Sequence, residues 1–166
     1  MLKIFKWAAF TVMALFMLAQ LVRPAKVNPQ VNEAVALEAH SEMDPEVAAL
    51  LKRACADCHS NRTEWPWYSN VAPVSWFVID HVNHGRSHLN FSTWAEYRPA
   101  ERVELLENIC EWVRLGWMPM ESYTLMHSEA RLSEQDKATI CEWASRERER
   151  LLADNGRKRE GRPSNN

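Results

Sequence analysis

The sequence predicts an all-α fold, with a small helical domain placed behind an apolar N-terminal segment. Several segments carry apolar residues at helical spacing, and no run of useful length alternates apolar and polar residues as a half-buried strand does. The 166 residues are enough for one domain with appendages. Only four glycines are present, which argues against a many-turned β fold and against a glycine-rich phosphate loop.

Residues 1–23 read as either a signal anchor or a signal peptide. Lys3 and Lys6 form a short positive region, and the run 7–22 that follows is uncharged and mostly apolar. As a helix this run is roughly 24 Å long, slightly short of the ~30 Å hydrocarbon core of a bilayer. No clear small-x-small cleavage site lies near its end, which favours an uncleaved transmembrane helix that holds the protein in the membrane.

Residues 24–43 are predicted to be a tether, because Pro24 and Pro29 lie there among mixed polar residues. A domain over residues 44–145 follows. Its first helix is expected to begin at Asp44-Pro45-Glu46, which combines an N-cap, a proline at the first helical position and an acid in the first turn. Apolar residues then recur at helical spacing, which predicts one buried face.

Three more helices are expected after a loop over residues 61–72. The second begins at Pro73 and ends at Gly85. The third runs over residues 99–115, and Gly116 stops it. The fourth begins at Ser133, where Ser-Glu-Gln-Asp resembles a capping box.

The charged residues 146–166 are predicted to be the fraying end of the fourth helix and a disordered tail. Acids alternate with bases along this tail, and the net charge of the chain is −2. We therefore expect no nucleic acid among the partners.

Cys55, Cys58 and His59 form the pattern C-x-x-C-H. Two thiols at this spacing can each add to one vinyl group of the same haem, and the adjacent histidine supplies an axial nitrogen to the iron. A zinc site needs two more ligands at a matching spacing, and a thioredoxin-like redox pair needs a βαβ context. The sequence offers neither, so we expect one covalently bound haem c per chain. Such haem is attached outside the cytoplasm, which places the domain on the extracytoplasmic side.

Met118 is the predicted sixth ligand of the iron, with Met120 as the reserve. Pro119 stiffens the turn that carries them, and a methionine opposite His59 completes a His/Met iron of raised reduction potential. His81 is the competing ligand, since it lies on the apolar face of the second helix.

Further histidines keep a bis-His haem or a second metal site open. His84 and His88 follow His81 at spacings that share its helix face if the helix passes Gly85, and His127 is a weaker candidate of the same kind.

Two other features leave alternatives open. Arg86 and the aromatic cluster of Trp65, Trp67 and Tyr68 can contact haem propionates, although solvated arginine and core aromatics are the commoner outcome. Cys110 and Cys141 lie on the inner faces of the third and fourth helices, where they either form a disulfide or remain two buried thiols.

The order of C-x-x-C-H, Gly-x-Met-Pro and Leu-Ser-Glu before a short helix resembles the layout of monohaem cytochromes c. The stretches CADCHSNRTEWPWYSNVAPVSWFVIDHVNHGRSHLNFSTW and MPMESYTLMHSEARLSEQDKATICEW are more specifically similar to the bacterial haem-binding domain family. The resemblance covers roughly residues 44–143 and implies a cytochrome c-like domain. The resemblance implies that the haem is attached at Cys55, Cys58 and His59 and that Met118 is a ligand of the iron.

These features predict a membrane-tethered haem protein of the inner membrane with its domain facing the periplasm. We expect it to pass single electrons between redox partner proteins and not to be an enzyme. The alternative is a haem peroxidase or a gas or redox sensor, whose iron is open or bis-His ligated.

Overall fold

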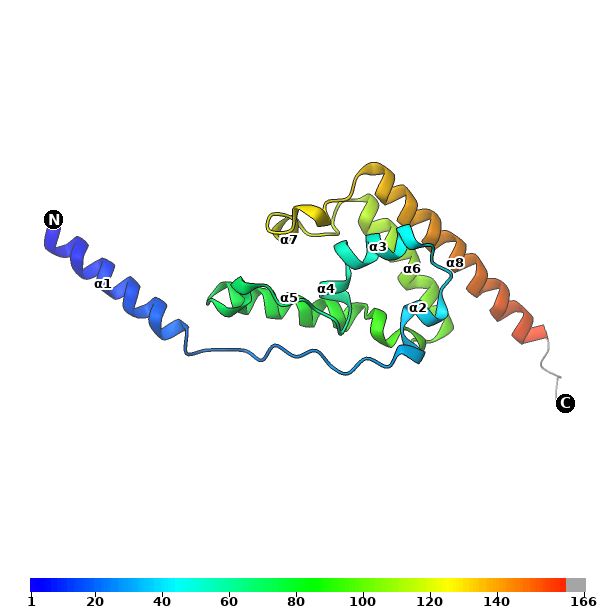
Figure 1. Ribbon diagram of the computed structural model, residues 1–166, viewed down its shortest axis with the longest axis horizontal. Coiled ribbons are helices and arrows are strands. Elements are labelled where there is room, and N and C mark those ends of the chain that lie inside the picture. The colour runs from blue at the N-terminus through cyan, green and yellow to red at the C-terminus, as the bar shows by residue number, and fades with distance from the viewer. Residues whose placement is uncertain (161–166) are drawn as a thin grey trace.

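The computed structural model describes residues 1–160, and every regular element in that range is helical (Figure 1), so the all-α prediction is confirmed. The helices are α1 (Leu2–Ala19), α2 (Leu37–His40), α3 (Pro45–Ala54), α4 (Ala56–His59), α5 (Val74–His88), α6 (Pro99–Arg114), α7 (Glu121–Thr124) and α8 (Glu134–Glu160). Short 3-10 turns are η1 (Glu33–Val35), η2 (Trp67–Asn70), η3 (Phe91–Glu96) and η4 (Ser128–Ala130).

Helix α1 stands away from the rest of the chain (Figure 1). Its 18 residues have a mean hydropathy of 1.7, and none of them is buried. At 1.5 Å per residue the helix is about 27 Å long. By length and composition it can cross a membrane, and a signal sequence meets the same criteria.

The hydrophobic core lies mainly between α6 and α8, which run side by side in opposite directions (Figure 1). Trp143 and Ile140 of α8 are fully buried against Leu106 of α6. Helix α3 covers the same core with Val47 and Leu50. A disulfide joins Cys110 to Cys141 across α6 and α8, which decides between the two states that the sequence left open for these cysteines.

Local capping signals place three helix ends as predicted. The backbone N–H of Val47 donates to the Asp44 carboxylate at 3.0 Å, which caps α3. Gly116 follows α6 with φ of 72°, the left-handed conformation that favours glycine. Ser133 and Asp136 cap α8 reciprocally, each backbone N–H donating to the other's side chain at 2.8 and 3.1 Å.

Helix α5 does not end at Gly85, so that prediction is wrong. The helix continues to His88, and the backbone N–H of Leu89 still donates to the Gly85 carbonyl. Gly85 does not have a positive φ, and it is needed for a different reason. A Cβ atom at this position would lie 2.5 Å from the carbonyl oxygen of Cys58, so only glycine lets α5 approach α4 this closely.

The segment 24–43 is more ordered than a free tether. Ala36 and Leu37 are buried, and η1 and α2 lie within the segment. Earlier in it, the side chain of Asn28 donates to the Thr63 carbonyl at 2.8 Å. The segment therefore runs along the domain.

Helix α8 likewise extends beyond the expected domain end at residue 145. Glu147 is only 4% exposed and accepts hydrogen bonds from the backbone N–H of Glu42 and the guanidinium of Arg150. Leu151 is also buried. The expectation of disorder from Arg146 onward is thus wrong for this part of the helix, because long-range contacts hold it. Residues 161–166 lie outside the described range.

Candidate functional site

The C-x-x-C-H residues form one helical turn between α3 and α5. Cys55 separates α3 from α4, because its φ of −128° and ψ of −39° are not helical. The backbone N–H of His59 donates to the Cys55 carbonyl at 2.9 Å, which closes the turn. Both thiols are free, in contrast to the bridged Cys110 and Cys141.

Burial keeps these two thiols protonated. It raises the pKa of Cys55 to about 12 and the pKa of Cys58 to about 11. A reactive redox cysteine has a lowered pKa, so the pair lacks the electrostatics of a dithiol–disulfide catalyst. The thiols are instead available as neutral S–H groups.

The His59 ring is held in one orientation by α5 and the residue that follows it. Its Nδ1 lies 3.0 Å from the carbonyl oxygens of both Gly85 and Leu89. A carbonyl can only accept, so Nδ1 carries the proton and Nε2 keeps its lone pair. Burial lowers the pKa of His59, which favours this neutral form. A neutral imidazole fixed through Nδ1 is the usual state of a histidine that binds a metal through Nε2.

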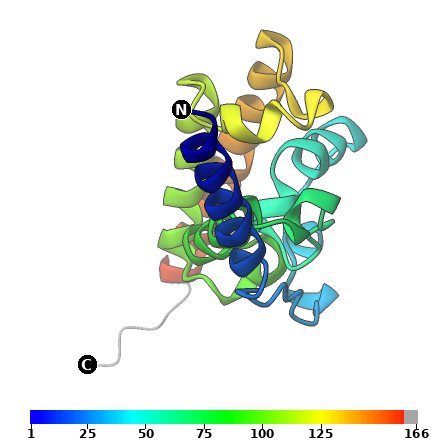
Figure 2. The ribbon, with the colours of Figure 1, turned by 90° about the vertical axis from the view of Figure 1, so that its left-hand side faces the viewer.

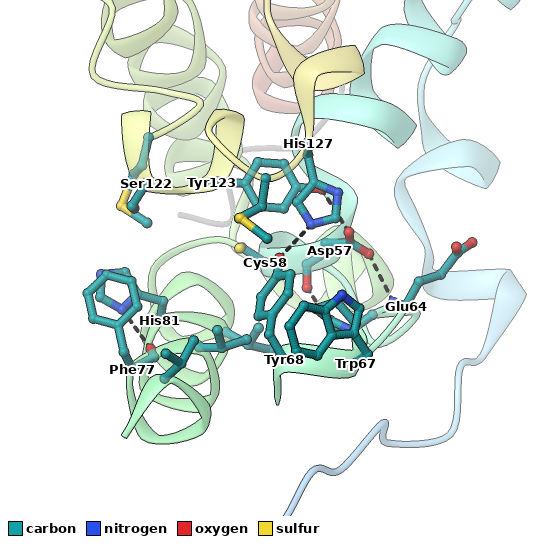
Figure 3. A pocket seen from close by; sticks show the side chains of 17 residues that line it. Asp57, Cys58, Glu64, Trp67, Tyr68, Phe77, His81, Ser122, Tyr123 and His127 are labelled. Atoms are coloured by element: carbon teal, nitrogen blue, oxygen red, sulfur yellow. Dashed lines mark hydrogen bonds between the residues drawn. The ribbon is translucent and has the colours of Figure 1, made fainter. Parts of the chain in front are cut away.

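A cavity of about 310 Å³ opens beside Cys58, between α5, α7 and the segment 63–68 (Figure 3). Among the three C-x-x-C-H side chains, only Cys58 lines it; Cys55 packs against the hydrophobic core. Most of the wall is apolar. The apolar and sulfur-containing wall residues are Cys58, Pro66, Trp67, Val74, Phe77, Val78, Val82, Met120 and Met126.

Some of the candidate distal ligands line this cavity and others do not. Met120 and His81 line it, whereas Met118 is half-buried and does not. His84 and His88 share helix α5 with His81, as their spacing indicated, but both are exposed. The cavity therefore places the reserve methionine and the competing histidine near Cys58.

A polar cluster borders the apolar wall (Figure 3). The Tyr123 hydroxyl donates to the Asp57 carboxylate at 2.7 Å, and its ring stacks on His127 with centroids 4.3 Å apart. The Tyr68 hydroxyl lies 2.7 Å from Nε2 of His127, whose Nδ1 lies 3.2 Å from the Glu129 carboxylate. Because a carboxylate only accepts, Nδ1 of His127 carries a proton, and a neutral ring then accepts at Nε2 from Tyr68.

Asp57 and Tyr123 were not singled out from the sequence. Asp57 lies inside C-x-x-C-H, where its type is not constrained by the motif, and Tyr123 is 66 residues away from it. Tyr68 and His127 were noted separately, but no spacing links two residues that lie 59 positions apart.

The Arg86 side chain makes hydrogen bonds that hold parts of the fold together. Its guanidinium donates to the Ser60 carbonyl at 2.8 Å, the Val27 carbonyl at 2.6 Å and the Asn28 and Thr63 side chains at 2.8 and 2.7 Å. These contacts fasten the N-terminal segment and the loop after His59 to α5. Arg86 thus acts as a structural clamp in this arrangement.

Among the residues that the structure describes, no group of three or more His, Cys, Asp or Glu side chains is arranged to hold a metal ion. What the site offers is two neutral thiols, one oriented imidazole and an adjoining apolar cavity.

Comparison with known proteins identifies a family. The model of the haem-binding domain family matches residues 14–146, which is most of the chain. No curated protein and no solved structure matches the chain. The chain belongs to the haem-binding domain family.

Proposed function

We propose that this haem-binding protein carries one covalently attached haem c and transfers single electrons at the periplasmic face of the inner membrane, to which α1 tethers it. The observation that carries the proposal is the pair of free thiols of Cys55 and Cys58 beside a His59 ring whose Nδ1 is already engaged. A bound haem supplies an iron that cycles between ferrous and ferric states.

The residues present fit this group chemically. Each thiol can add across one vinyl double bond, so that a sulfur–carbon bond forms and the thiol hydrogen passes to the other vinyl carbon. The thiols at Cys55 and Cys58 are unbridged, as this addition requires. His59 would supply Nε2 to the iron, and the carbonyls of Gly85 and Leu89 orient its ring through Nδ1.

A methionine is the proposed distal ligand, since a His/Met iron suits electron transfer at raised potential. Met118 is the ligand that the sequence predicts, and the cavity wall supports Met120 as its rival. The single variants Met118→Ala and Met120→Ala distinguish the two. Replacement of the methionine that binds the iron should lower the reduction potential and open the iron to external ligands. If only His81→Ala changes the spectrum, the iron is bis-His ligated.

Covalent attachment is tested by co-expression with a c-type maturation system, followed by extraction in acidic acetone. The wild type should retain its haem in the protein pellet, and the double variant Cys55→Ala/Cys58→Ala should lose it. The matched control is Cys110→Ala/Cys141→Ala, which removes the other two cysteines and should keep the haem bound. Complete extraction from the wild type would contradict the proposal.

The polar cluster favours one alternative, a haem peroxidase or sensor. Tyr68 and His127 hold exchangeable protons beside the cavity, where an open iron needs a proton donor. The visible spectrum of the purified protein separates the two functions. Low-spin bands support electron transfer, and high-spin bands that shift on adding cyanide or peroxide support the alternative.

A further inference from the structure

The mouth of the cavity is surrounded by exposed apolar side chains. Trp67 is 73% exposed, Phe77 49%, Val74 45%, Met126 53% and Leu125 75%. We call these five residues the apolar rim. Four of them line the cavity itself, and Leu125 adjoins Met126 in the chain. An apolar patch at the mouth of a cavity marks an interaction site, unlike single apolar residues scattered over a surface.

The segment that carries three of the rim residues contains no charged side chain. The fifteen residues 65–79 contain no Asp, Glu, Lys or Arg, and they include three tryptophans. Soluble surface loops and helix starts are normally rich in charge. Tryptophan and tyrosine, in contrast, gather where a membrane meets water, because their rings are apolar and their N–H or O–H groups remain hydrated.

The end of α1 is fixed directly beside this segment. Gln20, which caps α1, donates from its side chain to the Ala72 carbonyl at 3.1 Å and accepts from the Ala72 N–H at 3.0 Å. The indole N–H of Trp76 donates to the Val22 carbonyl at 2.8 Å. The start of α5 therefore lies at the level where α1 ends, and α7 lies at the same end of the domain (Figures 1 and 2).

Two basic side chains lie on the segment that leads away from this junction. Between Trp7 and Asn32 the charged residues are Arg23 and Lys26. Nζ of Lys26 lies 3.4 Å from the Ser69 hydroxyl and also donates to Asn70, so it is held against the segment that carries Trp67. Basic groups at this level are attracted to anionic lipid headgroups.

We propose that the apolar rim docks onto the membrane leaflet from which α1 emerges, so that the cavity mouth faces lipid. The inference rests on one part of the proposed function, the retention of α1 as a membrane helix. The occupant is a lipid surface, because the rim adjoins the end of a membrane-spanning helix and the uncharged segment 65–79 carries most of it, with Lys26 held against that segment.

Photo-crosslinking in the full chain tests this docking. The photoreactive amino acid p-benzoylphenylalanine is introduced singly in place of Phe77, Trp67, Phe10 or Leu152, and native membranes are irradiated. Phe10 lies on α1 and reports insertion of that helix. Leu152 is the matched control, because it is an apolar residue on α8 with an exposure of 50%, similar to the 49% of Phe77. Mass spectrometry identifies the adducts, and covalent haem is measured in the same samples.

We expect phospholipid adducts at positions 10, 67 and 77, and none at position 152. Lipid adducts at position 10 without any at 67 and 77 would overturn the docking while leaving the anchor in place. Protein adducts at 67 and 77 would also overturn it, since another chain then covers the rim. Absence of adducts at position 10 would refute both the anchor and the docking. Haem content is read independently, so failure of haem attachment is recognised separately.

Discussion

The two halves of the domain use the same residue type in opposite ways. In the disulfide half, formed by α3, α6 and α8, Cys110 and Cys141 face each other from different helices and form a bond. In the cavity half, formed by α4, α5 and α7, Cys55 and Cys58 share one helical turn and stay free. Position in the fold, not cysteine content, therefore decides which pair stabilises the chain and which pair is left for chemistry.

Packing follows the same division. The centre of the disulfide half is closely packed, with Trp143 and Ile140 completely buried. The cavity half instead contains an open cavity of about 310 Å³ whose wall is mostly apolar. Close packing at the centre therefore distinguishes the disulfide half from the cavity half.

The largest expected effect comes from removing the disulfide. The bond joins two cysteines that lie 31 positions apart in the sequence and so closes a loop of that length. Cys110→Ala/Cys141→Ala should lower the free energy of unfolding by about 3–4 kcal/mol, because the unfolded chain regains the entropy of that loop. Denaturant titration monitored by far-UV circular dichroism measures it. An unchanged midpoint would mean that the disulfide half does not set the stability.

Gly85→Ala should give the next effect, and it acts in the cavity half. The new methyl group would meet the backbone carbonyl of Cys58, which cannot move aside like a flexible side chain. We expect a loss of about 1–3 kcal/mol in the free energy of unfolding, together with less haem bound per chain. Gly156→Ala is the control. Nothing lies within 4 Å of a Cβ atom at that helical position, so this variant should be neutral or slightly more stable.

Tyr123→Phe should have a smaller effect, limited to the cavity half. It removes the hydrogen bond to the Asp57 carboxylate, and burial followed by that bond raises the pKa of Tyr123, so the hydroxyl is a donor at neutral pH. We expect a loss of about 1–2 kcal/mol and a changed visible haem spectrum. Tyr97→Phe is the matched variant, because its hydroxyl bonds the Asn90 N–H away from the cavity. Equal spectral changes in both variants would argue against a role for Asp57 and Tyr123 at the haem.

Asp136→Asn should give the smallest effect, in the disulfide half. The Ser133 N–H and hydroxyl and the nearby Arg53 hold the pKa of Asp136 below its usual 3.8. The carboxylate therefore stabilises the fold above pH 3.8, and this contribution is lost as the pH falls through the lowered pKa. Because the site is partly exposed and screened, we expect about 0.5–1 kcal/mol near neutral pH. The difference from the wild type should vanish in strong acid, and a constant difference would refute this origin.

Sequence rules worked where the cause of a structure is local. The cap at Asp44, the stop at Gly116 and the reciprocal cap of Ser133 and Asp136 all depend on neighbours within a few positions. The C-x-x-C-H motif is also local, and it led to the family that the comparison identifies.

Sequence rules failed where the cause lies far along the chain. Gly85 reads as a helix stop, but the carbonyl that requires glycine there belongs to Cys58. Residues after Arg146 read as a tail, although Glu147 is buried by a contact 105 positions away. The Asp57–Tyr123 contact likewise joins segments that only the fold brings together. The cytochrome c-like arrangement and the iron ligand opposite His59 remain predictions.

The clamp formed by Arg86 has a consequence for encounters with other proteins. If the 17 residues 20–36 were a free linker, their root-mean-square span would be about 20–25 Å, and the domain would sample a wide volume above the bilayer. With Val27 and Asn28 held by Arg86, this freedom is lost. Under the proposed function, a domain anchored in this way would be kept at one height and orientation. It would meet redox partners by lateral diffusion in two dimensions, and a partner's own cofactor would have to lie at a matching height above the membrane plane.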